Sequence, residues 1–116
     1  MPNITELSIK SIPTFQIDIL EYLPLRIQKL YLEKNNFINW DLRIIFKFIL
    51  SKDDIEKNLQ CLSFAGNNLT RIDLSSLKEE FVNLIELDFR KNKICKIFIN
   101  SQSFPSLKFV NCLIIV

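Results

Sequence analysis

The stretch LIELDFRKNKI, residues 84–94, decides the fold of this chain. It reads apolar-x-x-apolar-x-apolar-x-x-Asn-x-apolar, and the same eleven-residue pattern recurs at residues 27–37 (IQKLYLEKNNF) and 59–69 (LQCLSFAGNNL). Two weaker copies begin at Ile4 and Leu107, each with an isoleucine where the pattern has Asn. The copies therefore start at residues 4, 27, 59, 84 and 107, at steps of 23, 32, 25 and 23 residues.

This pattern resembles the leucine-rich repeat, whose usual length is 20–29 residues. The resemblance covers nearly the whole chain and implies one α/β domain over residues 1–116. The expected fold is a solenoid with one repeat for each of the five copies. Its parallel sheet would lie on the concave side, with short helices, 3-10 turns or loops on the convex side. End repeats of such arrays act as caps, which explains why the terminal copies are degenerate.

The spacing within each copy has a physical explanation. Side chains alternate between the two faces of a strand, so the fourth and sixth residues point into the core and the third, fifth and seventh point outwards. The Asn in the ninth place stands where the chain turns inwards and buried backbone groups need partners. Because an Asn side chain carries both donors and an acceptor, we expect Asn35, Asn67 and Asn92 to form a structural ladder between successive turns.

The outward residues of the three full copies form the candidate binding face of the concave sheet: Lys29, Tyr31, Glu33, Cys61, Ser63, Ala65, Glu86, Asp88 and Arg90. The middle copy contributes only small side chains to this face, and Gly66 follows them in the turn. The neighbouring copies supply larger side chains on both sides. The sequence therefore predicts a shallow notch over Cys61, Ser63, Ala65 and Gly66, which a partner's side chain could enter.

The second copy is followed by a long segment, and residues 40–58 have room for a helical insertion. Apolar residues recur at helical spacing across Leu42–Leu50, which predicts an amphipathic helix. Ile44 and Phe48 widen its apolar face. One interpretation is a thick local core, with Trp40 packed beneath the helix. The other is a contact with another chain, because wide apolar surfaces mark interaction sites.

Helix ends and the other returns can also be predicted. Asp41 is expected to cap the long helix, and Ser51–Asp54 resembles a capping box for a second short helix. Apolar residues three apart over 17–23 predict a short helical return in the first repeat. In the third repeat, Ser75–Val82 is expected to form one short helix. In the fourth, the Ser- and Pro-containing segment Asn100–Ser106 favours extended or 3-10 backbone.

The fifth copy is expected to form one strand, Lys108–Leu113, with apolar residues at outward positions where polar ones belong. Either the sequence is a fragment of a longer repeat array or a partner covers this edge, and we favour a partner, because an exposed apolar edge strand invites pairing with another chain. A second copy of the same chain is the expected partner, because most soluble oligomers are homo-oligomers. The candidate oligomer interface comprises Ile44, Phe48, Phe109, Leu113, Ile114, Ile115 and Val116.

Composition argues against catalysis. The chain has no His, which removes Cys–His and Ser–His–Asp mechanisms and most metal sites. Its three cysteines have no CxxC spacing, and a single glycine cannot form a Gly-rich phosphate loop. The acidic residues at 53–56 are explained by the start of a helix, without a metal. We therefore expect no enzymatic activity, no cofactor, no metal and no small-molecule substrate.

The leading hypothesis is a non-enzymatic protein–protein interaction module that self-associates and, as the resemblance implies, recognises proteins through its concave sheet. The alternative is a subunit of a ribonucleoprotein complex, in which Lys91, Lys93, Lys96 and Lys108 contact RNA from one rim. A net charge of only +2 and the lack of a dense basic block argue against RNA. The resemblance also allows an adaptor for a phosphatase or the cytoskeleton, which no residue discriminates.

Several features predict an intracellular location, in the cytoplasm or the nucleus. The N-terminus shows no signal peptide, and no apolar run is long enough to span a bilayer. Secreted proteins with this repeat usually carry flanking cysteine caps, and no such caps are present here. A reducing compartment without membrane contact is therefore expected.

Overall fold

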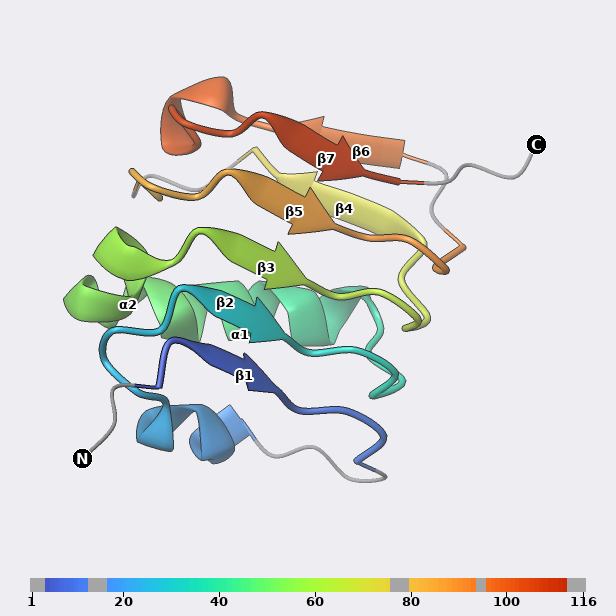
Figure 1. Ribbon diagram of the computed structural model, residues 1–116. Helices are drawn as coiled ribbons and strands as arrows, with labels where there is room; N and C mark the ends of the chain where they lie inside the picture. The colour runs from blue at the N-terminus through green and yellow to red at the C-terminus, as the bar shows by residue number, and fades with distance from the viewer. Residues whose placement is uncertain (1–3, 13–16, 76–79, 94–95, 113–116) are drawn as a thin grey trace.

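The computed structural model describes residues 4–12, 17–75, 80–93 and 96–112. The chain has an α/β architecture in which a parallel five-stranded sheet forms one side of the molecule (Figure 1). The elements, in chain order, are β1 (Glu6–Ser8), the 3-10 helix η1 (Ile17–Tyr22), β2 (Lys29–Tyr31), α1 (Asn39–Leu50), α2 (Asp53–Asn58), β3 (Cys61–Ser63), β4 (Arg71–Leu74), β5 (Glu86–Asp88), β6 (Lys96–Ile99), the 3-10 helix η2 (Ser101–Ser103) and β7 (Phe109–Asn111).

The five-stranded sheet has the order β1-β2-β3-β5-β7, with every neighbouring pair parallel. Each strand comprises the third, fourth and fifth residues of one motif copy. Their Cα partners are residues in the same place of the next copy, as for Leu30, Leu62 and Leu87. The alignment predicted by the motif copies is therefore confirmed as the strand register.

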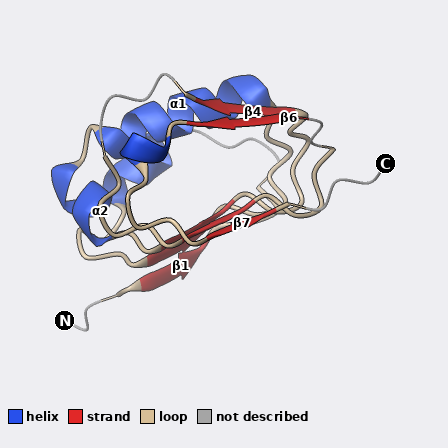
Figure 2. Cartoon of the chain, turned by 90° about the horizontal axis from the view of Figure 1, so that it is seen from above, coloured by secondary structure: helices blue, strands red, loops and turns tan. Residues whose placement is uncertain are grey.

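A second, two-stranded parallel sheet lies across the core from the first one (Figure 2). It pairs β4 with β6, with Arg71 opposite Lys96 and Leu74 opposite Ile99. The sequence analysis did not predict this pairing. Near the end of β4, the carboxylate of Asp73 accepts hydrogen bonds from the N–H and the hydroxyl of Ser75, which follows the strand, at 3.2 and 2.6 Å.

The expected helix over Ser75–Val82 is not present in its described parts. Ser75 is a turn residue and residues 80–82 are not helical, while residues 76–79 lie outside the described residues. The Asp73–Ser75 contacts explain why no helix begins at Ser75. A carboxylate that accepts the backbone N–H two residues later in the chain stabilises a turn in place of a helix. The other two returns are confirmed: η1 matches the three-residue spacing over 17–23, and η2 lies within Asn100–Ser106.

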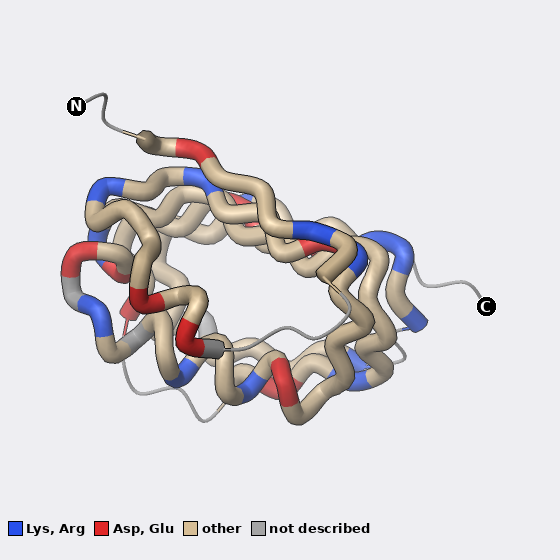
Figure 3. The backbone as a smooth tube through the Cα atoms, turned by 90° about the horizontal axis from the view of Figure 1, so that it is seen from below, with Lys and Arg blue, Asp and Glu red and all other residues tan. Residues whose placement is uncertain are grey.

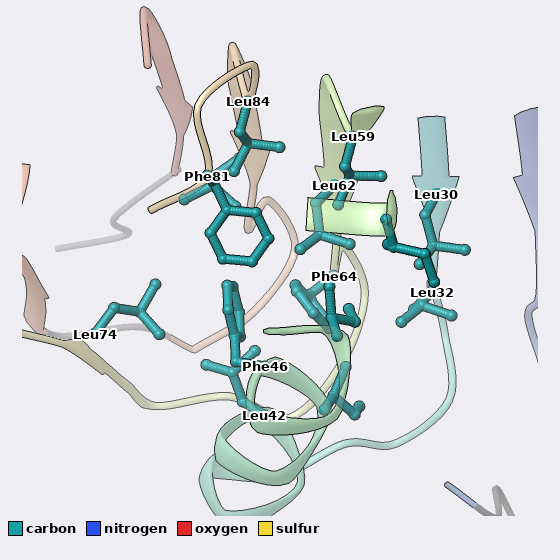
Figure 4. Close-up of a cluster of buried hydrophobic side chains, with 14 of the residues drawn as sticks. Leu30, Leu32, Leu42, Phe46, Leu59, Leu62, Phe64, Leu74, Phe81 and Leu84 are labelled. Carbon is teal, nitrogen blue, oxygen red and sulfur yellow. The ribbon is translucent and has the colours of Figure 1, made fainter. Parts of the chain in front are cut away.

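The core between the layers is built around phenylalanine rings and leucines (Figure 4). Phe64 lies at its centre, with ring centroids 5.7 Å from Phe46 of α1 and 6.0 Å from Phe89 of the next turn. Phe46 also meets Phe81 edge-on at 5.8 Å, and Phe81 stacks on Phe104 at 5.6 Å. Aromatic pairs at these separations add stability beyond the burial of their area. The helix α1 thus packs against the sheet through Phe46, which contacts side chains from two different turns.

The helical insertion is confirmed, but its details differ from those expected. The helix α1 begins at Asn39, and Asp41 lies in its first turn, where its Oδ2 accepts the N–H of Ile38 at 2.9 Å. Trp40 is 65% exposed, so the prediction that it packs beneath the helix is wrong. The reason is geometric: two residues correspond to about 200° around a helix, which places Trp40 opposite the buried Leu42.

The expected capping box before the second helix is also wrong. Lys52 is the residue that precedes α2, and it makes no capping hydrogen bond with its side chain. The hydroxyl of Ser51 instead donates to the carbonyl of Phe48 at 2.6 Å, at the end of α1. In the described part of the chain, neither this helix nor any other is both long and apolar enough to cross a membrane.

Candidate binding groove on the five-stranded sheet

The third and fifth residues of each copy point away from the core and form what we call the outer face. These residues are Glu6, Ser8, Lys29, Tyr31, Cys61, Ser63, Glu86, Asp88, Phe109 and Asn111. The outer face includes the predicted binding residues except for those in seventh place, Glu33, Ala65 and Arg90, which follow the strands. The structure therefore brings the predicted set together at one side of the sheet, but it changes which of them are accessible.

The predicted notch is closed over β3. Ser63 is 1% exposed, because its hydroxyl donates to Oε2 of Glu33 at 2.6 Å and accepts the N–H of Ala65 at 3.3 Å. Cys61 is buried as well, and its thiol donates to Oε1 of Glu86 at 3.4 Å. The notch prediction is thus wrong for Cys61 and Ser63, because longer side chains of the neighbouring turns cover these small residues.

The Cys61 thiol is held in its protonated form. Burial, followed by the hydrogen bond to Glu86 and the charge of that carboxylate, raises the pKa of Cys61 to about 12. Burial, followed by the proximity of Cys61, likewise raises the pKa of Tyr31. Both groups are neutral near pH 7, and the thiolate is the reactive form of a cysteine. The centre of the outer face is therefore a neutral, hydrogen-bonded patch.

Asp88 and Arg90 form a hydrogen-bonded ion pair. The buried carboxylate of Asp88 accepts Nη2–H of Arg90 at 2.7 Å, Nε–H at 3.0 and 3.1 Å, and the backbone N–H of Arg90 at 3.0 Å. The hydrogen bonds to Asp88, followed by its charge, raise the pKa of Arg90. The pair fixes the direction of the Arg90 side chain along the turn that follows β5.

The turns after the strands share one backbone conformation. The eighth residue of each of the first four copies has positive φ: Ser11 at 59°, Lys34 at 56°, Gly66 at 71° and Lys91 at 59°. The N–H groups of Ser11, Lys34 and Gly66 donate to carbonyls of the next turn at 3.1, 3.1 and 2.9 Å. Successive turns therefore stack in register at the carboxyl ends of the strands, where Figure 3 shows several basic segments.

A depression of about 480 Å³ opens in this stack, and we call it the turn groove. Its lining residues are Lys10, Glu33, Lys34, Ala65, Gly66, Arg90, Lys91 and Asn92. It forms because the turn with the two smallest residues, Ala65 and Gly66, lies between two turns with long charged side chains. The part of the predicted notch that remains open is thus Ala65 with Gly66, beyond the end of β3.

Basic side chains dominate the turn groove. Arg90 is engaged by Asp88, and Glu33 accepts the hydroxyl of Ser63. In residues 4–12, 17–75, 80–93 and 96–112, no carboxylate lies within 4.0 Å of the ammonium groups of Lys10, Lys34 or Lys91. Sequence reasoning missed Lys10 and Lys34 as site residues, and it named Lys91 only as an RNA contact. The signal was present, because the chain's one glycine occupies the same motif place as Lys34 and Lys91.

The Asn residues in the ninth place of the copies form hydrogen bonds with the backbone of the turns that line the groove. Asn67 accepts the N–H groups of Asn35 and Phe37 at 2.9 and 3.1 Å and donates to the carbonyls of Leu32 and Phe64 at 3.1 and 2.8 Å. Its four hydrogen bonds thereby join two successive turns.

The other two Asn residues extend the same arrangement. Asn35 accepts the N–H of Ile12 and donates to the carbonyl of Ile9, while Asn92 accepts the N–H of Leu69 and donates to the carbonyl of Phe64. Each of the three side chains thus reaches the preceding turn, and the ladder runs across the sheet.

The candidate oligomer residues are divided. Phe109 on β7 is 56% exposed. The other four residues of the predicted interface at this end, Leu113, Ile114, Ile115 and Val116, lie outside the described residues. Ile44 and Phe48 are both partly buried. Phe48 packs against the core on one side, and the Lys52 ammonium lies 5.5 Å from its ring centroid. The helix therefore does not present these two residues as an exposed apolar face.

The four lysines of the RNA hypothesis do not share one rim. Lys91 lies in the turn beyond the carboxyl end of β5, next to the turn groove. Lys108 lies at the opposite end of the strands, where its N–H donates to the carbonyl of Ile85 before β5 begins. Lys96 starts β6 in the second sheet. The expectation that all four lysines share one rim is wrong for Lys108, because the length of a strand separates it from Lys91.

Comparisons with protein-family models, with curated proteins and with solved structures give no match. Among the described residues, no group of three or more Cys, Asp or Glu is placed to hold a metal ion.

Proposed function

We propose that this chain is a leucine-rich-repeat-type module that binds proteins and catalyses no reaction. Support comes from the motif-spaced parallel strands and the Asn side chains between turns. None of the helices in the described residues covers the outer face of the five-stranded sheet (Figure 2). The free thiols of Cys61 and Cys112 fit an intracellular, reducing compartment. The ribonucleoprotein alternative is the weaker hypothesis, because its lysines lie at separate places on the molecule.

We further propose that the module self-associates through the edge formed by β7 and β6. The observation that carries this proposal is the exposure of Val110. In the fourth place of the copies, Leu30, Leu62 and Leu87 are fully buried, whereas Val110 is 39% exposed. Each of the three leucines lies between two neighbouring strands, but β7 pairs only with β5 among the described strands. An apolar row normally found inside the core is therefore open to a partner.

The same edge continues on the second sheet. Ile97 and Ile99 of β6 pack against the core but stay partly exposed, and β6 pairs only with β4 among the described strands. Edge strands also offer unpaired N–H and C=O groups, which favour pairing with another strand. Together with Val110, these groups form an edge that crosses both layers, and Phe109 lies beside it on the outer face. A second copy is the simplest occupant, since closed symmetric homo-oligomers predominate among soluble assemblies.

The test is the solution mass by light scattering on a sizing column, over a dilution series. We expect a stable multiple of 13.7 kDa for the natural sequence and a monomer for the double variant Phe109→Lys/Val110→Lys. The matched control is Ile19→Lys/Tyr22→Lys, which places the same charges on exposed apolar residues of η1 and should keep the natural mass. A natural chain that stays monomeric at all concentrations would refute self-association.

A further inference from the structure

We propose that the turn groove binds an acidic side chain from an extended segment of a partner protein. This inference rests on the proposed role as a protein-binding module, but it does not depend on self-association through β7. The groove opens at the carboxyl end of β3, where Ala65 and Gly66 lie between the turns of Lys34 and Lys91. Its volume of about 480 Å³ suits one or two side chains.

The charges of the groove select an anion. Four basic side chains line it, and the carboxylate of Glu33 is the one acidic group among its lining residues. That carboxylate accepts the Ser63 hydroxyl at 2.6 Å, and Arg90 is held against Asp88. The ammonium groups of the three lysines are therefore left to bind a ligand. Such groups on opposite walls can converge on one carboxylate, because lysine side chains are flexible point charges.

The backbone of the groove argues for a carboxylate and against a phosphate. Phosphate sites commonly use free backbone N–H groups in turns and at helix starts. Here the N–H groups of Lys34 and Gly66 already donate to carbonyls of the next turn at 3.1 and 2.9 Å.

The distribution of basic residues argues against a nucleic acid as the occupant. A nucleic acid needs a run of basic contacts along its backbone. The basic groups of the groove are confined to the stacked turns, and Lys108 lies at the far end of the strands. The outer face beside the groove is instead made of the neutral Tyr31 and Cys61 with Glu86. An extended peptide can lie on such a surface while one acidic side chain enters the groove.

The test uses a fluorescein-labelled hexaglutamate peptide, with hexaglutamine as the uncharged reference, and measures fluorescence anisotropy at low ionic strength. The decisive variant is Lys34→Gly/Lys91→Gly. It removes two charges and leaves the backbone unstrained, since glycine adopts positive φ freely. Hexaglutamate affinity should fall about 25-fold, because a charge pair at about 4 Å in water corresponds to about fivefold for each lysine. The matched control, Lys47→Ala/Lys57→Ala, removes the same charge from α1 and α2 and should change affinity less than about twofold.

A second variant distinguishes the groove from a diffuse positive field. Ala65→Leu keeps every charge but fills the depression, so it should weaken hexaglutamate binding by about tenfold if the side chain enters. Equal losses in the groove variant and the control, or equal binding of hexaglutamine, would overturn the proposal. So would stronger competition by inorganic phosphate or oligouridylate than by free hexaglutamate.

Two further outcomes separate this inference from the proposed function. If Lys34→Gly/Lys91→Gly changes the mass measured by light scattering, the groove is occupied by a second copy, and the partner-peptide proposal is wrong. If the Phe109→Lys/Val110→Lys variant becomes monomeric while the natural chain does not bind hexaglutamate, self-association stands and the groove proposal fails.

Discussion

Replacing Gly66 by Ala tests the backbone on which the turn groove depends. Gly66 has a φ of +71°, in the left-handed region that costs a residue with a Cβ roughly 1–2 kcal/mol. An added Cβ would also lie 3.0 Å from Cγ of Lys34, so that side chain must shift. Alanine reduces the entropy of the unfolded chain, which offsets about 0.4–1 kcal/mol. We therefore expect a net destabilisation of about 1 kcal/mol, or about 4 °C in Tm.

The assay is urea unfolding followed by far-UV circular dichroism. Ala65→Gly is the control, because Ala65 does not have positive φ and should lose only the entropic contribution of about 0.4–1 kcal/mol. Lys34→Gly should raise the free energy of unfolding by about 0.5 kcal/mol, since it relieves the left-handed strain at that position. In a chain that already carries Lys34→Gly, Gly66→Ala should lower the free energy of unfolding by less, because the contact with Lys34 Cγ is absent.

The reasoning has a clear point of failure. If Gly66→Ala unfolds at the same or a higher urea concentration than the natural chain, the left-handed conformation is not required at this turn. The stacked geometry of the groove walls would then lose its physical basis. If Lys34→Gly leaves the cost of Gly66→Ala unchanged, the contact between these turns is not the source of any part of the effect.

Asn67→Ala should lower the free energy of unfolding by about 3–5 kcal/mol in the same assay, because two buried N–H groups and two carbonyls lose their partner; a cost no larger than that of the exposed Asn68→Ala would contradict the ladder. Cys61 should react with iodoacetamide far more slowly at pH 8 in the folded chain than in urea, because its folded pKa is about 12; equal rates in both states would contradict its burial. Since this pKa is raised above the ordinary value of 9.0, unfolding releases a proton, and stability should be unaffected by Cys61 below about pH 9 and fall as pH rises from there to about 12.

The strand register could be predicted from sequence because it depends on local chemistry repeated along the chain. Leu30, Leu62 and Leu87 stand in the same motif place, and a shift of one residue would turn each of them to the wrong face of the sheet. Asn35 and Asn67 could be placed for a similar reason. Their motif place is the point where backbone groups turn inwards and need partners.

The candidate site was predicted only in part. The low volume of the middle copy is visible in the sequence, but the accessibility of Ser63 depends on where the longer Glu33 side chain lies. That position is set by a hydrogen bond between residues 30 apart in the chain. Lys34 was missed because it occupies a left-handed turn position, where glycine or Asn is the usual residue.

The sequence by itself determined the periodic features: the five parallel strands, their register and the three Asn side chains between turns. These follow from alternation and from hydrogen-bond requirements, which act on each copy in the same way. Only the tertiary structure decided the pairing of β4 with β6, the exposure of Trp40 and the position of the open groove. Each of these depends on which side chains of different turns meet, because neighbours packed across the layers determine what stays accessible to solvent.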